Sequence, residues 1–116
     1  MLADKTPEGA LASFFAQPFK NAYVTAGPVT AYLRKSARYD QASRDYFTCL
    51  DIASISVATV KRRQGYCTRF IKASQLMGLP VFVECAHNPQ VQRLCLRLGF
   101  VRLLGEDNNF LWRPTT

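Results

Sequence analysis

The 116 residues of the chain favour a single domain, because a second hydrophobic core of ordinary size would need more residues. A hydrophobic fraction of 48% and an aromatic fraction of 12% are typical of a folded protein and exclude a disordered chain. The net charge of +7 favours an anionic partner, whether nucleic acid, an acidic protein or a polyanionic small molecule.

Neither a membrane segment nor a metal site is expected from the sequence. The apolar runs are far shorter than the roughly 18 residues that span a bilayer. The N-terminal residues include an acid and a proline where a signal peptide would be basic, so we expect a cytoplasmic protein. The cysteines are spread singly and form no CxxC pair, which argues for reduced thiols and against a zinc site. They are Cys49, Cys67, Cys85 and Cys95.

The first half of the sequence predicts a short helix followed by strands. Thr6 is a good N-cap and Pro7 suits the first helical position, so a helix is expected to begin there and to end before Pro18. Strands are expected over 22–25 and 29–39, with a Gly-Pro turn between them.

The segment 46–57 gives the strongest strand signal, because it is rich in aromatic and β-branched residues. Leu50 and Ile52 alternate as a strand requires, but the next large apolar residue, Ile55, comes three positions later. One extra residue at 53–54 predicts a β-bulge. Such a bulge would splay the strand from a neighbour and leave backbone groups available to a ligand.

The second half predicts alternating helices and strands. Helical spacing follows a start near Gly65, and Asn88 with Pro89 has the pattern of a second helix start. We therefore expect an α/β or α+β domain with a mixed, mostly antiparallel sheet and at least one right-handed βαβ unit. The expected elements are a helix over 65–77, a buried strand over 80–86, a helix over 88–99 and strands over 100–104 and 110–112.

The loop after the bulged strand has the composition of a phosphate site. A helix beginning near Gly65 offers unpaired N–H groups and a positive dipole end, and glycine lets an anion approach closely. Lys61, Arg62 and Arg63 add positive charge. A nucleic-acid surface is the alternative interpretation, but Tyr66 is the only aromatic residue in this basic run that would stack on bases.

The same residues resemble a known family. The run 57–71, VATVKRRQGYCTRFI, resembles motif A of the GNAT superfamily of N-acetyltransferases, in which a strand leads into (Arg/Gln)-x-x-Gly-x-(Gly/Ala) at a helix start. Asn88, Leu94 and the triplet 98–100 resemble motif B of that family. The two motifs extend over roughly residues 50–101. Compact GNAT-like chains of this kind are also familiar from phage.

The resemblance implies a cosubstrate and a reaction. Acetyl-CoA would bind without a metal, and its acetyl group would move to a primary amine by direct attack. The pantetheine arm would lie on the bulged strand, and the pyrophosphate on the helix start that follows. The residues expected at the cosubstrate are Ile55, Ser56, Val57, Arg62, Arg63, Gln64, Gly65, Tyr66, Cys67, Thr68 and Asn88.

Four residues are candidates for proton transfer. Cys95 stands where many family members have the Tyr that protonates the departing thiolate, although it can also be a core residue. Asp51 lies where histone-acetylating members carry a catalytic Glu, unless it is only a solvent-facing carboxylate. Glu84 and His87 flank the end of the next strand. Cys67 replaces the last Gly or Ala of motif A, either as a tolerated small residue or as a thiol whose pKa the helix start lowers.

We expect one GNAT-like domain over 1–116. In it, 1–45 would form a shortened acceptor side, 46–78 would bind the pyrophosphate, and 79–116 would complete the sheet. Fewer residues precede the strand at 29–39 than the family spends on a strand and two helices. This difference leaves a wide acceptor site for a protein substrate, a cleft completed in a homodimer, or a loss of catalysis.

The leading interpretation is therefore an acetyl-CoA-dependent N-acetyltransferase, whose acceptor amine belongs to a protein lysine or a small molecule. The first alternative is a non-catalytic CoA-binding module or protein-interaction protein. The second, less favoured alternative is a small basic nucleic-acid-binding protein.

Overall fold

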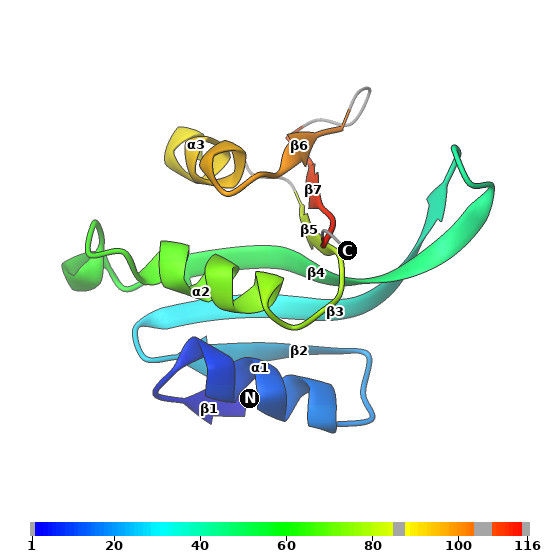
Figure 1. The fold of residues 1–116 in the computed structure, drawn as a ribbon. Helices are drawn as coiled ribbons and strands as arrows, with labels where there is room; N and C mark the ends of the chain where they lie inside the picture. Colours follow the sequence, from blue (N-terminus) through cyan, green and yellow to red (C-terminus); the bar gives the residue numbers. More distant parts are fainter. Residues whose placement is uncertain (1, 85–87, 104–107, 115–116) are drawn as a thin grey trace.

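The computed structural model describes residues 2–84, 88–103 and 108–114. Within these ranges the chain forms one seven-stranded mixed sheet and three α-helices (Figure 1), so the predicted mixed α/β class is confirmed. The elements are β1 (Leu2–Asp4), α1 (Pro7–Ala16), β2 (Asn21–Ala26), β3 (Val29–Asp40), β4 (Asp45–Val57), the 3₁₀ turn η1 (Thr59–Lys61), α2 (Tyr66–Gln75), β5 (Val81–Val83), α3 (Pro89–Arg97), β6 (Val101–Arg102) and β7 (Phe110–Trp112).

The strands lie in the order β1-β2-β3-β4-β5-β7-β6. The β1–β2 and β4–β5 pairs are parallel, and the other pairs are antiparallel. Because β4, α2 and β5 follow one another, they form the predicted βαβ unit. The sequence analysis did not predict β1. One helix, α1, lies between β1 and β2, where the family resemblance implies two.

The predicted helix starts are confirmed by their capping bonds. The Thr6 hydroxyl accepts a hydrogen bond from the Gly9 N–H at 3.1 Å, and the Asn88 side chain accepts one from the Gln90 N–H at 2.8 Å. Each cap is followed by a proline, whose missing N–H costs nothing at that position. In the part of the chain that the structure describes, no helix has the length and apolar character needed to cross a membrane.

The predicted bulge is also present. Tyr32 pairs with Ser54 and Leu33 pairs with Ile52, so Ala53 has no partner in the β3–β4 register. The pairing of β4 with β5 covers only 50–52, although β4 itself continues five residues further, to Val57. β5 ends at Val83, opposite Ile52, so in the described structure β5 pairs with no residue of β4 beyond Ile52, and we call this point the fork.

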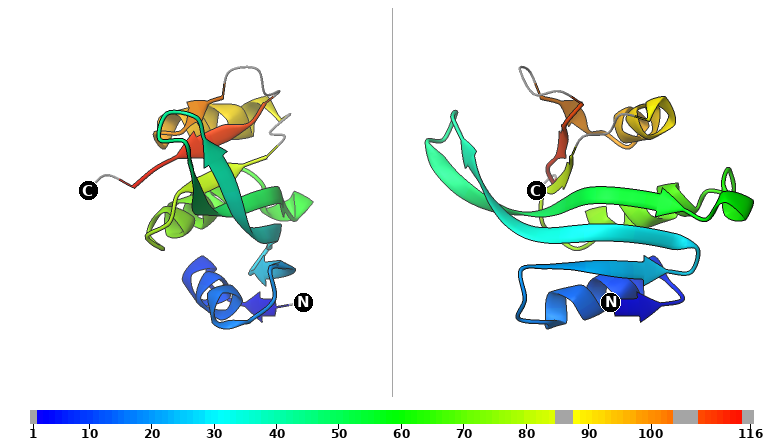
Figure 2. Two further views of the ribbon diagram at one scale, coloured as in Figure 1. Left: turned by 90° about the vertical axis from the view of Figure 1, so that its right-hand side faces the viewer. Right: turned by 180° about the vertical axis from the view of Figure 1, so that it is seen from behind.

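Successive side chains of each strand point to opposite faces of the sheet, so the sheet has two distinct faces. Helices α1 and α2 contact one another and cover the same face, where Leu50 and Ile52 join the core. Asp51 lies between these two residues and points to the opposite face, which we call the far face. In the view from behind, α1 and α2 lie beyond the long strands β3 and β4 (Figure 2, right).

A core substitution tests this packing. Leu33 is fully buried, so Leu33→Ala should lower the free energy of unfolding by about 2–5 kcal/mol, through lost burial and a residual cavity. Leu76 is 81% exposed, and Leu76→Ala is the matched control, with an expected change below about 0.5 kcal/mol. Urea denaturation followed by circular dichroism measures both. Equal effects would contradict the assignment of the core.

Candidate active site

A groove of about 1070 Å³ lies between the end of β4, the start of α2 and the helix α3. Ten of the eleven residues that the sequence analysis assigned to the cosubstrate line this groove, and Gln64 is the exception. We call it the α2–α3 groove. The sequence analysis missed the contribution of α3, which adds Arg93 and Arg97. Their spacing of four residues places both on one helix face, which is the signal that would have suggested them.

The backbone at the start of α2 is left open toward this groove. Arg63 and Gly65 both have left-handed backbone conformations, with φ of 65° and 80°, and they turn the chain into the helix. Gly65 is the N-cap and has no side chain to accept from the first N–H groups of α2. A Cβ built on Gly65 would meet no described atom within 4 Å. An anion therefore has direct access to the helix N-terminus.

The charge of the α2–α3 groove matches this backbone arrangement. None of the described residues that line it is acidic, whereas five are basic. Arg62 is held in place by a hydrogen bond from its Nε to the Val57 carbonyl at 3.2 Å. A groove with this balance suits a ligand that carries several phosphate charges. The basic residues are Lys61, Arg62, Arg63, Arg93 and Arg97.

The two cysteines of this region are not placed for acid chemistry. Cys67 lines the groove, and burial raises the pKa of its thiol to about 11, which favours its interpretation as a tolerated small residue over that of a thiol with a lowered pKa. Cys95 is fully buried in the core and is not among the described residues that line the groove. Burial and the nearby Cys67 raise the pKa of the Cys95 thiol to about 12. A thiol this weakly acidic is a poor donor to a departing thiolate.

Two carboxylates meet at the fork. The Glu84 N–H donates to the Ile52 carbonyl at 3.1 Å, which extends the β4–β5 pairing by one hydrogen bond beyond Val83. Asp51, one residue before Ile52, is only 1% exposed, so the interpretation of Asp51 as a solvent-facing carboxylate is wrong. The α2–α3 groove begins at Ile55, on the other side of the bulge.

Asp51 is a buried acid with an incomplete set of partners. Its Oδ2 accepts a hydrogen bond from Arg38 Nη2 at 3.1 Å, while its Oδ1 has no hydrogen-bond partner in the described structure. Burial raises the pKa of Asp51 to about 6, the neighbouring Glu84 charge adds to this rise, and Arg38 opposes it. Asp51 therefore gains or loses its proton near neutral pH, which is the range useful for acid–base chemistry.

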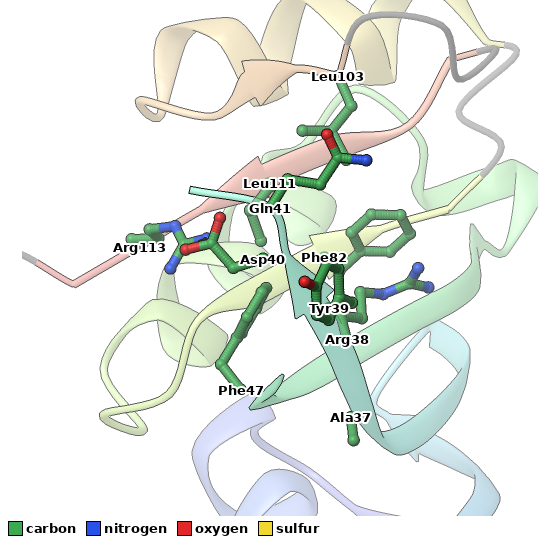
Figure 3. Close-up of a pocket in the computed structure, with 10 residues that line it drawn as sticks. All are labelled: Ala37, Arg38, Tyr39, Asp40, Gln41, Phe47, Phe82, Leu103, Leu111 and Arg113. Carbon is green, nitrogen blue, oxygen red and sulfur yellow. Dashed lines mark ion pairs between the residues drawn. The ribbon is translucent and has the colours of Figure 1, made fainter. Parts of the chain in front are cut away.

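A second cavity, of about 520 Å³, opens on the far face (Figure 3), and Asp51 is not among the described residues that line it. Arg38 and Phe82 line it, and the Arg38 guanidinium lies 3.4 Å from the centre of the Phe82 ring. Phe82 is the register partner of Asp51, so the cavity begins one strand away from the carboxylate. Its remaining wall comes from the end of the β3–β4 hairpin and from β7, with Phe47, Leu111 and Arg113.

A further candidate, His87, lies outside the described residues, and so does the fourth cysteine, Cys85. In the described ranges, no group of three or more His, Cys, Asp and Glu side chains is arranged to hold a metal ion.

Comparisons with known proteins identify the fold. A scan against protein-family models and a search of curated proteins each gave no match. Among solved structures, the chain is similar to a mutant of the toxin AtaT bound to the C-terminus of the antitoxin AtaR and acetyl-CoA, with a TM-score of 0.56 and 21% identity over 72% of this chain and 57% of that one. It is also similar to AtaT complexed with acetyl-methionyl-tRNAfMet, with a TM-score of 0.56 and 18% identity over 73% of this chain and 61% of that one.

A third similar structure is the Bacillus subtilis N-acetyltransferase YlbP in complex with coenzyme A, with a TM-score of 0.51 and 14% identity over 75% of this chain and 68% of that one. The fold is therefore that of the acyl-CoA N-acyltransferases. More particularly, the chain has the GNAT fold that motifs A and B predicted. It spans less than two thirds of the length of the AtaT chains that it matches.

The raised pKa of Asp51 predicts a pH-dependent stability. The native state holds this proton more tightly than the unfolded chain does. Ionisation of Asp51 therefore lowers the free energy of unfolding as pH rises from about 4 through about 6. Asp51→Asn removes this titration. The free energy of unfolding of the variant, relative to the wild type, should therefore rise by on the order of 2 kcal/mol between pH 4 and pH 7.

Asp40→Asn is the control with the opposite sign. A hydrogen bond from the Ala42 N–H lowers the pKa of Asp40. The free energy of unfolding of the wild type should therefore rise relative to that of this variant as pH rises through the acid range. Urea denaturation at a series of pH values measures both differences. A pH-independent difference for Asp51→Asn would show that the carboxyl has an ordinary pKa.

Proposed function

We propose that this protein is an acetyl-CoA-dependent N-acetyltransferase that moves the acetyl group to a primary amine by direct attack. The observation that carries the proposal is the α2–α3 groove, where an uncapped helix start and five basic side chains adjoin the fork of β4 and β5. The complexes of AtaT with acetyl-CoA and of YlbP with coenzyme A give this fold the same class of cosubstrate.

The groove supports a definite orientation for the cosubstrate. The pyrophosphate would accept hydrogen bonds from the N–H groups at the start of α2, next to Gly65. The adenosine 3′-phosphate would meet the remaining basic side chains. The pantetheine arm would run along the backbone of β4 at 55–57, because β5 ends opposite Ile52 and does not pair with that part of the β4 edge.

The thioester then lies at the fork, next to the two carboxylates. An amine enters the site as an ammonium ion and passes one proton to Asp51 or Glu84. The neutral nitrogen attacks the thioester carbonyl, the C–N bond forms and the C–S bond breaks. The nitrogen loses a second proton, which neutralises the CoA thiolate, and the carboxylate later releases the first proton to solvent. This route requires no proton from Cys95, whose thiol lies in the core.

The acceptor is a primary amine that reaches the fork from the far face, where the cavity of Figure 3 has room for the group that carries it. The complex of AtaT with acetyl-methionyl-tRNAfMet supports an amine borne by a larger molecule. A CoA-binding module without turnover is the second candidate, and the observation that favours it is the buried Cys95 at the family's tyrosine position. Thiol release from acetyl-CoA with a panel of amines and peptides separates the two.

Gly65→Glu tests the cosubstrate site. A carboxylate at the helix start would repel the pyrophosphate and fill the space that it needs, so the affinity for acetyl-CoA should fall at least tenfold in calorimetric titration.

Gly78→Glu is the matched control for this variant. Gly78 also has a positive φ, of 88°, and open space at its Cβ, but it lies beyond the other end of α2. Gly78→Glu should therefore bear similar backbone strain and keep the wild-type affinity. If both variants bind like the wild type, the pyrophosphate does not lie at Gly65. If the wild type itself does not bind acetyl-CoA, the proposed function is wrong.

A further inference from the structure

We propose that Asp51 and Glu84 act as one proton-accepting pair, and that Arg38 and Arg34 are the positioning residues that hold this pair at the fork. The inference rests on the proposed function, because the pair takes its proton from the acceptor amine. It goes beyond that function by assigning two arginines of β3 that neither the motifs nor the family resemblance indicated.

The geometry gives each carboxylate one arginine. Arg34 and Arg38 are four residues apart on β3, so both point to the far face. Arg38 Nη2 lies 3.1 Å from Asp51 Oδ2, and Arg34 Nη1 lies 3.4 Å from Glu84 Oε2. Arg34 is the register partner of Asp51, yet it ion-pairs with Glu84. Two carboxylates and two cations therefore form a compact cluster across three neighbouring strands.

The two carboxylates of the cluster differ in burial, and this difference decides which of them holds a proton. Asp51 is 1% exposed, whereas the Glu84 side chain is 29% exposed. Burial and the neighbouring Glu84 charge both disfavour the ionised form of Asp51, so Asp51 is the member of the pair that holds the proton. The unpartnered Oδ1 of Asp51 is free to carry that proton. Glu84, with its greater exposure, is the member of the pair that meets the incoming amine.

Arg38 is fixed from two sides. Its guanidinium plane lies against Phe82, which is fully buried and is itself the register partner of Asp51. A cation held on an aromatic face loses little freedom when it pairs with an acid. Arg38 also lines the far-face cavity, so one side chain touches both the proton acceptor and the space proposed for the acceptor (Figure 3).

No other described group near the pair titrates in the same range. The charged groups that face Asp51 are Arg34 and Arg38 from β3 and Glu84 after β5. Cys49 lies two residues away on β4, and burial raises the pKa of its thiol, which keeps it neutral. A proton uptake near neutral pH is therefore a property of the carboxylate pair.

The first test is a titration that does not depend on turnover. Carboxyl ¹³C chemical shifts, recorded against pH, report the protonation of Asp51 and Glu84 directly. Arg38→Gln removes the opposing cation, so the Asp51 transition should move up by about one pH unit or more. Arg38→Lys should restore part of the shift. Glu84→Gln removes the neighbouring charge and should move the Asp51 transition down, which provides a second variant if Arg38→Gln does not fold.

The second test connects the pair to the reaction. The acid limb of kcat/KM for acetyl transfer to an amine should follow the carboxyl transition in each variant, while the Kd for acetyl-CoA should stay within about twofold of the wild type. Lys72→Gln is the control. Lys72 is exposed on α2 and lines neither the α2–α3 groove nor the far-face cavity, so neither the carboxyl transition nor the acid limb should move.

The outcomes separate the two claims. If acetyl transfer occurs and the acid limb of kcat/KM is the same in Arg38→Gln and Glu84→Gln as in the wild type, the carboxylate pair is overturned and the proposed function stands. An Asp51 transition near its ordinary value in the wild type would also overturn the pair. Absence of both acetyl-CoA binding and turnover in the wild type would overturn the proposed function, and the proton-accepting role of the pair with it.

Discussion

The separation of β4 from β5 is the constraint on which the rest of the site depends. A single extra residue, Ala53, breaks the register of β4 against β3, and the pairing with β5 ends at the same place. Beyond that point the edge of β4 faces the α2–α3 groove, and just before it Asp51 turns to the far face. A continuous sheet would keep these two surfaces apart. Under the proposed function, an acyl group on one side of the fork would meet an amine that comes from the other.

The two sides of the fork handle charge by different means. In the α2–α3 groove, the backbone at the start of α2 and exposed basic side chains border open space, so an anionic ligand can enter and leave without a permanent partner. On the far face, charge is buried and must be compensated inside the protein. Asp51 is stable there only because Arg38 contacts it and Phe82 supports Arg38. The α2–α3 groove therefore has the features of an anion-binding site, and the far face contains a buried acid with a raised pKa.

The parts of the fold that depend on neighbouring residues were predictable from the sequence. The caps at Thr6 and Asn88 and the bulge at 53–54 follow from short-range patterns, and the structure contains all three. Strand β1 was not predictable, because three residues carry no periodicity and the strand depends on its pairing with β2.

The burial of Asp51 was likewise beyond the sequence, since an alternating strand pattern does not say which elements cover each face, whereas the burial of Cys95 agrees with its interpretation as a core residue. The same limit explains why Arg38 was missed. Its significance arises from a carboxylate thirteen residues away on β4 and a ring on β5, which only the sheet order brings together.

Arg38 thus links three strands, and a ligand in the far-face cavity would contact the same guanidinium that holds Asp51. Occupation of that cavity would exclude water from the Arg38–Asp51 pair and strengthen their attraction, because screening falls as solvent leaves. Under the proposed mechanism, binding of the acceptor would therefore be coupled through Arg38 to the ionised state of Asp51.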